Sequence, residues 1–168
     1  AVTCDAADTV KRVTLELGGK SPNLVFADCD LEERVNASVE ECMFNTGQSC
    51  DAPTRLLVER ACYDDVVKIA KRAAEETDVG DPADEGDHIG PLFDKIQYER
   101  VQRMIKVGID EGATLLAGGI GKPEGIDKGW FVKPTIFSDV SNDMRIAQEE
   151  IFGPVLVIIP FEDESDAI

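Results

Sequence analysis

A run of five aliphatic residues, Val155–Ile159, lies between two prolines and limits most strongly what this chain can fold into. The run is far shorter than the roughly 20 apolar residues that cross a bilayer. A short apolar run bounded by prolines is typical of a strand buried inside a sheet. We therefore expect a core strand here, and no membrane anchor.

Short apolar segments alternate with amphipathic helical segments along the rest of the chain. The other expected strands are Val13–Leu17, Leu24–Phe26, Leu56–Val58, Leu115–Leu116 and Phe131–Phe137. The first expected helix begins after an N-cap at Asp30, supported by Glu33, and ends near residues 45–47. Further helices are expected over Tyr63–Thr77, over about Asp94–Glu111 and from Glu164 onward. Strands that alternate with helices form a parallel-rich sheet with helices on both faces. The sequence thus predicts one α/β domain over residues 1–168.

Acidic side chains outnumber basic ones by 34 to 17, which gives a formal net charge of −17. With 43% hydrophobic residues the chain can still bury a core, so we expect the excess charge on the surface. Nucleic acids and anionic lipid headgroups are bound by patches of Lys and Arg. The composition therefore disfavours both nucleic-acid and membrane partners.

The cysteines and the single histidine exclude several kinds of site. The five cysteines at 4, 29, 42, 50 and 62 form no Cys-x-x-Cys pair, and His88 is the only histidine. This spacing argues against a disulfide framework and against a zinc or other metal site. Free thiols, and residues 1–8 without a signal-like pattern, lead us to expect a cytoplasmic protein.

Two residues are candidates for chemistry. Cys50 follows an expected helix end in a loop of small residues, whereas Cys42 and Cys62 lie in or beside apolar runs. A cysteine is most often a small buried apolar residue, but a thiol in an open loop is available for reaction. Glu16 lies between two leucines of an expected core strand. It either faces solvent at the strand end or is desolvated, with a raised pKa that suits a general base.

The segments around these two residues resemble signatures of the aldehyde dehydrogenase superfamily. Residues 13–23 (VTLELGGKSPN) are similar to its glutamate signature, residues 44–55 (FNTGQSCDAPTR) to its cysteine signature, and residues 149–154 (EEIFGP) to a third hallmark. Cys50 follows Glu16 by 34 positions, a spacing that also resembles the family's. The resemblance implies an aldehyde dehydrogenase catalytic-domain fold and the oxidation of an aldehyde to a carboxylic acid.

The resemblance also implies catalytic roles. Cys50 would attack the aldehyde and carry a thioester, and its backbone N–H would supply half of an oxyanion hole. Glu16 would activate the water that hydrolyses the thioester. Asp51 departs from the small or neutral residues that relatives commonly carry after the nucleophile.

A nicotinamide cofactor, NAD or NADP, is implied by the same resemblance. Glu150 would hold the nicotinamide ribose, Phe152 would pack beside it, and the Leu17 carbonyl would face the carboxamide. Gln97, with Arg100 one turn later, matches a further ribose contact. The implied partner is a small-molecule aldehyde, and the parent enzyme is expected to be a homo-oligomer, a dimer or tetramer.

Family chains are considerably longer than this one. We therefore expect residues 1–168 to be an excised part of the catalytic domain that has little or no activity alone. Two other functions stay open from the sequence. One is a non-catalytic domain of the same fold with a binding or structural role, and the other is a cysteine hydrolase that pairs Cys50 with His88.

Overall fold

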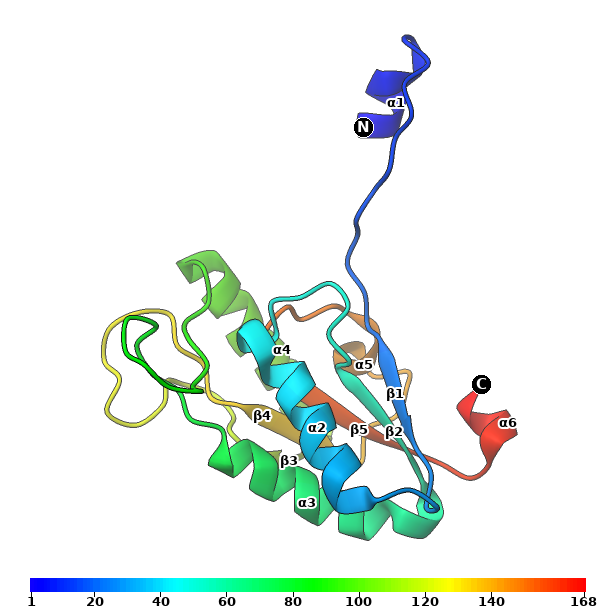
Figure 1. Cartoon of the computed structure of the whole chain (residues 1–168), viewed down its shortest axis with the longest axis vertical. Coiled ribbons are helices and arrows are strands. Elements are labelled where there is room, and N and C mark those ends of the chain that lie inside the picture. Colours follow the sequence, from blue (N-terminus) through cyan, green and yellow to red (C-terminus); the bar gives the residue numbers. More distant parts are fainter.

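The computed structural model describes all residues from 1 to 168, and Figure 1 shows how its elements are arranged. The helices are α1 (Val2–Ala7), α2 (Leu31–Met43), α3 (Tyr63–Glu76), α4 (Lys95–Asp110), α5 (Arg145–Gln148) and α6 (Glu164–Ala167), with short 3-10 turns η1 (Phe44–Gly47) and η2 (Arg60–Cys62). The strands are β1 (Pro22–Val25), β2 (Arg55–Glu59), β3 (Thr114–Ala117), β4 (Thr135–Ser138) and β5 (Val155–Phe161).

The five strands form one sheet in the order β1-β2-β5-β4-β3. Strands β1, β2, β5 and β4 are parallel, and only the edge strand β3 runs antiparallel to its neighbour β4. Strand β5 occupies the centre, as expected for the continuous apolar run. The predicted α/β fold with a parallel-rich sheet is confirmed.

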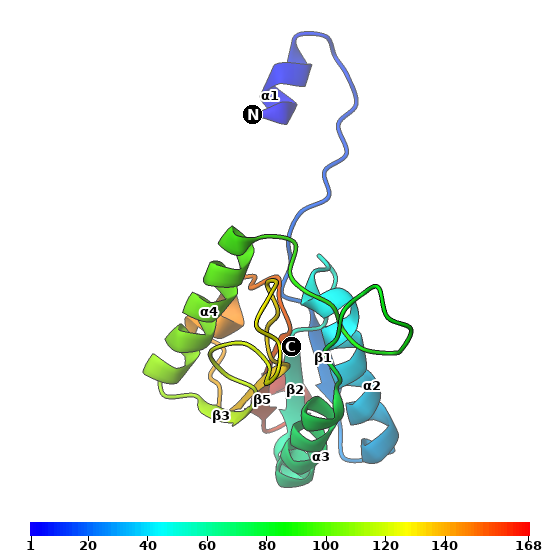
Figure 2. The ribbon, with the colours of Figure 1, turned by 90° about the vertical axis from the view of Figure 1, so that its left-hand side faces the viewer.

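Helices cover both faces of this sheet (Figure 2). Along β5, Leu156 and Ile158 belong to one buried cluster, with residues of α2 and α3, whereas Val155, Val157 and Ile159 belong to a second cluster, with residues of α4 and α5. Successive side chains of a strand point to opposite faces. The central strand is therefore apolar along its whole length because both of its faces lie in a core.

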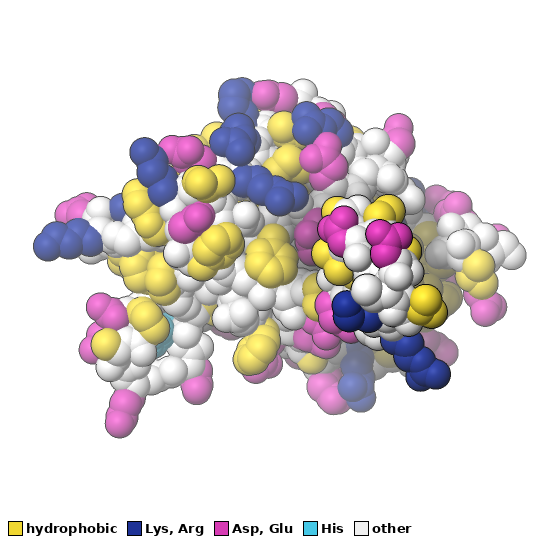
Figure 3. All heavy atoms as spheres, turned by 90° about the horizontal axis from the view of Figure 1, so that it is seen from above, with side chains coloured by type: hydrophobic (Ala, Val, Ile, Leu, Met, Phe, Trp, Pro, Cys, Tyr) yellow, Lys and Arg dark blue, Asp and Glu magenta, His cyan; other side chains and the backbone are white.

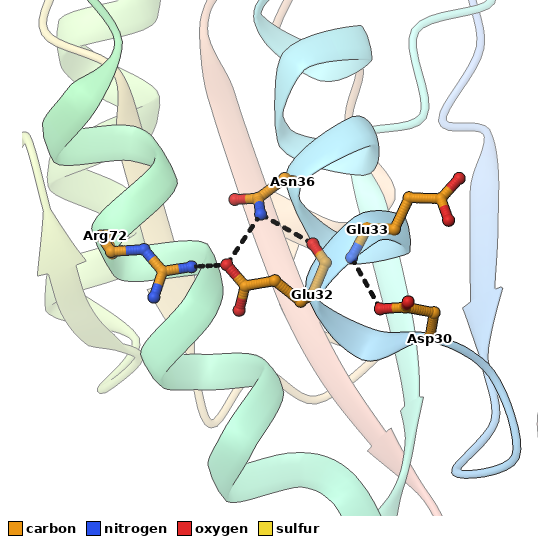
Figure 4. Close-up of polar contacts among 5 residues, drawn as sticks. All are labelled: Asp30, Glu32, Glu33, Asn36 and Arg72. Carbon is orange, nitrogen blue, oxygen red and sulfur yellow. Dashed lines mark hydrogen bonds and ion pairs between the residues drawn. The ribbon is translucent and has the colours of Figure 1, made fainter.

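The predicted N-cap at Asp30 is confirmed, since its carboxylate accepts a hydrogen bond of 3.1 Å from the Glu33 backbone N–H (Figure 4). The Glu33 side chain pairs with Arg34 instead of completing a capping box. The preceding residue, Glu32, forms an ion pair with Arg72 of α3, and Asn36 donates to the same carboxylate. These contacts join the two helices that cover one face of the sheet.

Two expected strands are wrong in whole or in part. Residues 13–17 form no strand, because β1 pairs only with β2, whose first residue, Arg55, lies opposite Pro22. Arg55 still donates to the carbonyls of Ser21 and Lys20, but no strand pairs with residues 13–17. The chain upstream of β1 leaves the body as an extended segment toward α1 (Figure 1). The strand expected over 131–137 is limited to β4, because the preceding residues are not paired in the sheet.

No helix of the chain combines the length and the apolar character that a membrane span requires.

Candidate active site

The strand order brings the three signature segments together at one end of the sheet. The segment 13–21 leads into β1, the segment 48–54 leads into β2, and the segment 149–154 leads into β5. These three strands are adjacent and parallel, so their amino ends lie side by side at the upper end of the sheet in Figure 1. Residues separated by more than 100 positions in the sequence therefore meet at one place.

Gly18 and Gly19 form the point of contact. The Gly19 N–H donates a hydrogen bond of 3.2 Å to Oε1 of Glu150. A Cβ on Gly18 would lie only 2.2 Å from Oε2 of that carboxylate, and a Cβ on Gly19 only 2.7 Å from the Cys50 carbonyl oxygen. Only glycine leaves room for this approach, so the two glycines allow the glutamate segment to pack against both Glu150 and the cysteine segment.

The loop that carries Cys50 begins with an unusual backbone. Asn45, Thr46 and Gly47 all have positive φ, at 49°, 60° and 68°. A Cβ on Gly47 would lie 2.2 Å from the Gly153 carbonyl oxygen, so the cysteine loop also packs tightly on the segment before β5. Three consecutive left-handed residues turn the chain sharply between the end of α2 and Cys50.

Side chains of this turn bind the backbone of the connection after α3. The Thr46 hydroxyl donates to the Gly90 carbonyl at 3.0 Å, and the Gln48 amide accepts from the Phe93 N–H at 3.0 Å. Gln48 also donates to the Asn45 carbonyl at 3.1 Å. The backbone before the candidate nucleophile is therefore held by hydrogen bonds on both sides.

Cys50 itself is exposed, whereas Cys42 and Cys62 are buried, as expected from the sequence. The Cys50 N–H donates to no other group of the chain, so it is free to donate to an oxygen of a bound substrate. The neighbouring Asp51 carboxylate accepts a hydrogen bond of 2.5 Å from the Ser49 hydroxyl. This hydrogen bond, followed by one from the Asp51 backbone, lowers the pKa of Asp51 below its usual value and favours the ionised carboxylate.

Glu16 and Leu17 lie in the extended segment, and both side chains are exposed. No hydrogen bond or ion pair joins Glu16 to Cys50. Leu17 lies directly before the Gly18–Gly19 contact, so the backbone of the glutamate signature reaches the site. The roles expected for the Glu16 side chain and the Leu17 carbonyl stay predictions.

The remaining predicted residues gather around Glu150. Phe152 is half-buried and has φ of 58°. Gln97 is only 6% exposed, and its amide donates to the Ile151 carbonyl at 2.9 Å and to the Phe152 carbonyl at 2.7 Å. Arg100 donates to the Glu150 carbonyl at 2.5 Å. Gln97 is thus bound to the backbone of the third hallmark, and its contact with a cofactor stays a prediction.

A buried amino group lies behind the site. The Lys20 Nζ atom is buried without a hydrogen-bond partner, although part of its side chain reaches the surface. Burial lowers the pKa of Lys20 to about 8, with smaller effects of Cys42, Arg55 and Glu150. Burial also raises the pKa of Cys42 to about 12, which keeps that thiol protonated at neutral pH.

His88 does not approach Cys50. Its Nε2 atom lies 2.8 Å from the Asp81 carbonyl oxygen, within the connection after α3. The ring borders a cavity of about 820 Å³ between α2, α3 and this connection, and Cys50 does not line that cavity. The geometry therefore disfavours a cysteine hydrolase. No group of three or more His, Cys, Asp or Glu side chains is arranged to hold a metal ion.

Comparison with known proteins agrees with the three signatures. The model described as "Aldehyde dehydrogenase family" matches residues 1–168. The chain belongs to the aldehyde dehydrogenase family.

Two relatives of known name or structure show how closely this family membership holds. The chain is 52% identical over 167 residues to a 3-succinoylsemialdehyde-pyridine dehydrogenase of a Pseudomonas species, covering 99% of this chain and 35% of that protein. It superposes with a TM-score of 0.96 and 51% identity on the crystal structure of an aldehyde dehydrogenase from Bartonella henselae, again covering 99% of this chain and 35% of the other.

A third relative is a structure of an aldehyde dehydrogenase C mutant from Pseudomonas syringae in complex with NAD+ and octanal. It matches with a TM-score of 0.95 and 46% identity, over 99% of this chain and 34% of that one. The chain thus spans about 35% of the length of the curated aldehyde dehydrogenase relatives that it matches.

The sequence did not predict the packing roles of Gly47, Gly153 and Gln97. Gly153 has no room for a side chain, because a Cβ there would lie 2.6 Å from Val101 of α4. Each of the three motifs contains a glycine, which could have indicated a close backbone contact. The backbone that each glycine approaches is determined only by the strand order.

Proposed function

We propose that this chain forms the catalytic part of a longer enzyme that oxidises an aldehyde to a carboxylic acid with NAD or NADP. One observation carries the proposal: the backbone of Gly18–Gly19 contacts both the Glu150 carboxylate and the Cys50 carbonyl. The glutamate, cysteine and third family signatures therefore converge on one site, with an exposed thiol in it.

Cys50 starts the reaction in this proposal. Its thiolate adds to the aldehyde carbon, which forms a C–S bond and leaves the negative charge on the carbonyl oxygen. The free N–H of Cys50 donates to this oxygen and stabilises the charge. The chain's own part of the first step is thus a nucleophile and one oxyanion donor from a single residue.

The residues around Glu150 fit a nicotinamide cofactor. Oε1 of Glu150 accepts from the Gly19 N–H, whereas Oε2 has no donor in the chain and is free to accept from ribose hydroxyls. Glu150 would hold the ribose and Phe152 would pack beside it. A bound nicotinamide would supply the acceptor for the hydride that the carbon on Cys50 must lose before that residue can hold a thioester.

Glu16 completes the cycle. Its carboxylate takes a proton from a water molecule, and the resulting hydroxide attacks the thioester carbon. The C–S bond then breaks, which releases the acid and restores the Cys50 thiolate. This step requires the Glu16 side chain, which is exposed on the extended segment 11–20, to turn toward Cys50.

Substitution of Cys50 in the full-length enzyme tests the proposal. We expect Cys50→Ser to lower the rate of aldehyde-dependent NADH or NADPH formation by about 10³-fold or more, because a serine hydroxyl without a base is a poor nucleophile. Cys4→Ser is the matched control, since Cys4 is also exposed but lies in α1. Equal rates for Cys50→Ser and the control would refute the proposed nucleophile.

A further inference from the structure

Two side chains of α4 hold three consecutive backbone carbonyls. Gln97 donates to the carbonyls of Ile151 and Phe152, and Arg100, one turn later, donates to the carbonyl of Glu150. Helix α4 lies beside α5 and the segment that follows it (Figure 2). No backbone N–H reaches any of these three carbonyls, so the α4 side chains are their only donors within the chain.

This support is needed because the segment has a strained and partly buried backbone. Phe152 adopts the left-handed region at φ 58°, which is unfavourable for residues that carry a Cβ atom. Ile151 is 1% exposed, so its carbonyl would lack a partner without the Gln97 amide. The two N–H groups of one amide satisfy two carbonyls on either side of the strained residue.

The held segment in turn places Glu150. Its carboxylate meets the Gly19 N–H at 3.2 Å, and the neighbouring Gly153 carbonyl packs against Gly47 of the cysteine loop. Segment 150–153 is therefore wedged between α4 and the two other signature segments. A change at Gln97 would move Glu150 relative to Gly18–Gly19.

We infer that Gln97 is a positioning residue for the cofactor site: it holds Phe152 in its left-handed conformation and thereby fixes the Glu150 carboxylate, with Arg100 as a second support. The nearly complete burial of Gln97, with its amide bound to two carbonyls, supports this role over direct binding of the ribose. The inference rests on the proposed function, because it assigns Glu150 to cofactor binding.

A double-mutant cycle in the full-length enzyme separates the two roles. We expect Gln97→Met, which keeps the length of the side chain but removes both donors, to weaken NAD binding about tenfold, measured by calorimetry. If Gln97 acts through Glu150, the double variant with Glu150→Gln binds NAD no more weakly than Glu150→Gln alone. Losses that add would mean that Gln97 contacts the cofactor directly, and would overturn the inference.

Hydrogen exchange of residues 149–155 gives a readout that needs no cofactor. Gln97→Met should speed exchange in this segment. Gln102→Met is the matched control, because Gln102 lies on the same helix and accepts from the Gly121 N–H at 2.6 Å, away from the site. Unchanged exchange at 149–155 in Gln97→Met, or equal acceleration by the control, would overturn the inference.

Two further outcomes have a defined meaning. If the unsubstituted enzyme binds neither NAD nor NADP, the proposed function fails, and the exchange measurement alone decides whether Gln97 holds the segment. If Gln97→Met does not fold, the same cycle with Arg100→Met decides, because Arg100 is exposed and its loss leaves the core intact. Additive losses in that cycle would likewise count against positioning through Glu150.

Discussion

Asp51 follows the candidate nucleophile directly in the sequence, and its side chain is exposed. The Ser49 hydroxyl holds this carboxylate at 2.5 Å and lowers its pKa, so it is ionised at neutral pH. A fixed charge next to the reacting carbon attracts cationic substrates and repels anionic ones. If the Asp51 carboxylate faces the substrate in the full-length enzyme, aldehydes without a free carboxylate would be favoured.

We therefore expect Asp51→Asn in the full-length enzyme to change substrate preference. The ratio of kcat/KM for a cationic aldehyde to kcat/KM for an anionic aldehyde of similar size should fall about fivefold, as for loss of one partly solvated charge interaction. Asp28→Asn is the control, because Asp28 is exposed and follows the carboxyl end of β1, whereas the site lies at the amino ends of the strands. An unchanged ratio in Asp51→Asn would show that the carboxylate does not select substrates.

Lys20 makes stability depend on pH in a direction that is unusual for lysine. Its pKa falls from 10.5 to about 8 on folding, so the unfolded chain holds more protons between these two values and stability rises with pH across that window. The cost of burying the charged amine is fully present below pH 8 and is relieved above it. The raised pKa of the Cys42 thiol has the opposite effect: above pH 9 this thiol ionises in the unfolded chain but not in the folded chain, so its contribution makes stability fall as the pH rises.

Replacing Lys20 by Met should accordingly stabilise the chain at neutral pH. We expect a gain of up to about 3 kcal/mol in the free energy of unfolding at pH 7, which shrinks as the pH rises through 8 toward 10.5. Urea unfolding of both chains at several pH values measures this difference, and the Cys42 contribution is common to both. A gain that is independent of pH would mean that the Lys20 amine is not desolvated.

At the scale of elements, the sequence predicted helices better than strands. Asp30 and Asp94 were both expected at helix starts, and each carboxylate accepts from the N–H three residues on. A helix cap is local, so the sequence contains it. The strand expected over 13–17 was wrong because a strand requires a neighbour, and the residues before β2 instead form the Cys50 loop.

The tight turn before Cys50 provides a test at this scale. Gly47→Ala should lower the free energy of unfolding by about 2 kcal/mol or more and also lower activity, because the new Cβ would meet the Gly153 carbonyl at 2.2 Å. Gly112→Ala is the control, since Gly112 also has positive φ, at 91°, but no atom lies within 4 Å of its Cβ position. If the two variants lose equal stability, steric contact at Gly47 is not the cause.

For the whole molecule, the strand order decides where the chemistry lies. The sequence singled out Cys50, Glu16 and Glu150, but the contact of the Gly18–Gly19 backbone with Glu150 and Cys50 follows from the adjacency of β1, β2 and β5. Strand order depends on long-range packing, which the spacing of motifs does not reveal. The end of the molecule that carries the amino ends of these strands exposes hydrophobic side chains among charged ones (Figure 3). Phe44, Phe93 and Ile96 are each about 70% exposed.

The chain as a unit should bind the cofactor weakly. Glu150 and Phe152 are its principal candidates for cofactor contact, and the chain spans only about 35% of the length of its relatives. We expect calorimetry of residues 1–168 with NAD or NADP to show no binding in the micromolar range. Tight binding to these residues alone would show that they contain a complete cofactor site.

The central claim is that Cys50 carries the acyl group and Glu16 releases it. The most direct measurement uses the full-length enzyme with Glu16→Gln, mixed with propanal and NAD or NADP, quenched in acid and analysed by peptide mass spectrometry. The account predicts one propionyl group on the peptide that contains Cys50, and none when the cofactor is omitted, since a thioester forms only after oxidation. An acyl group on another cysteine, or sustained aldehyde oxidation without any acyl group on Cys50, would contradict it.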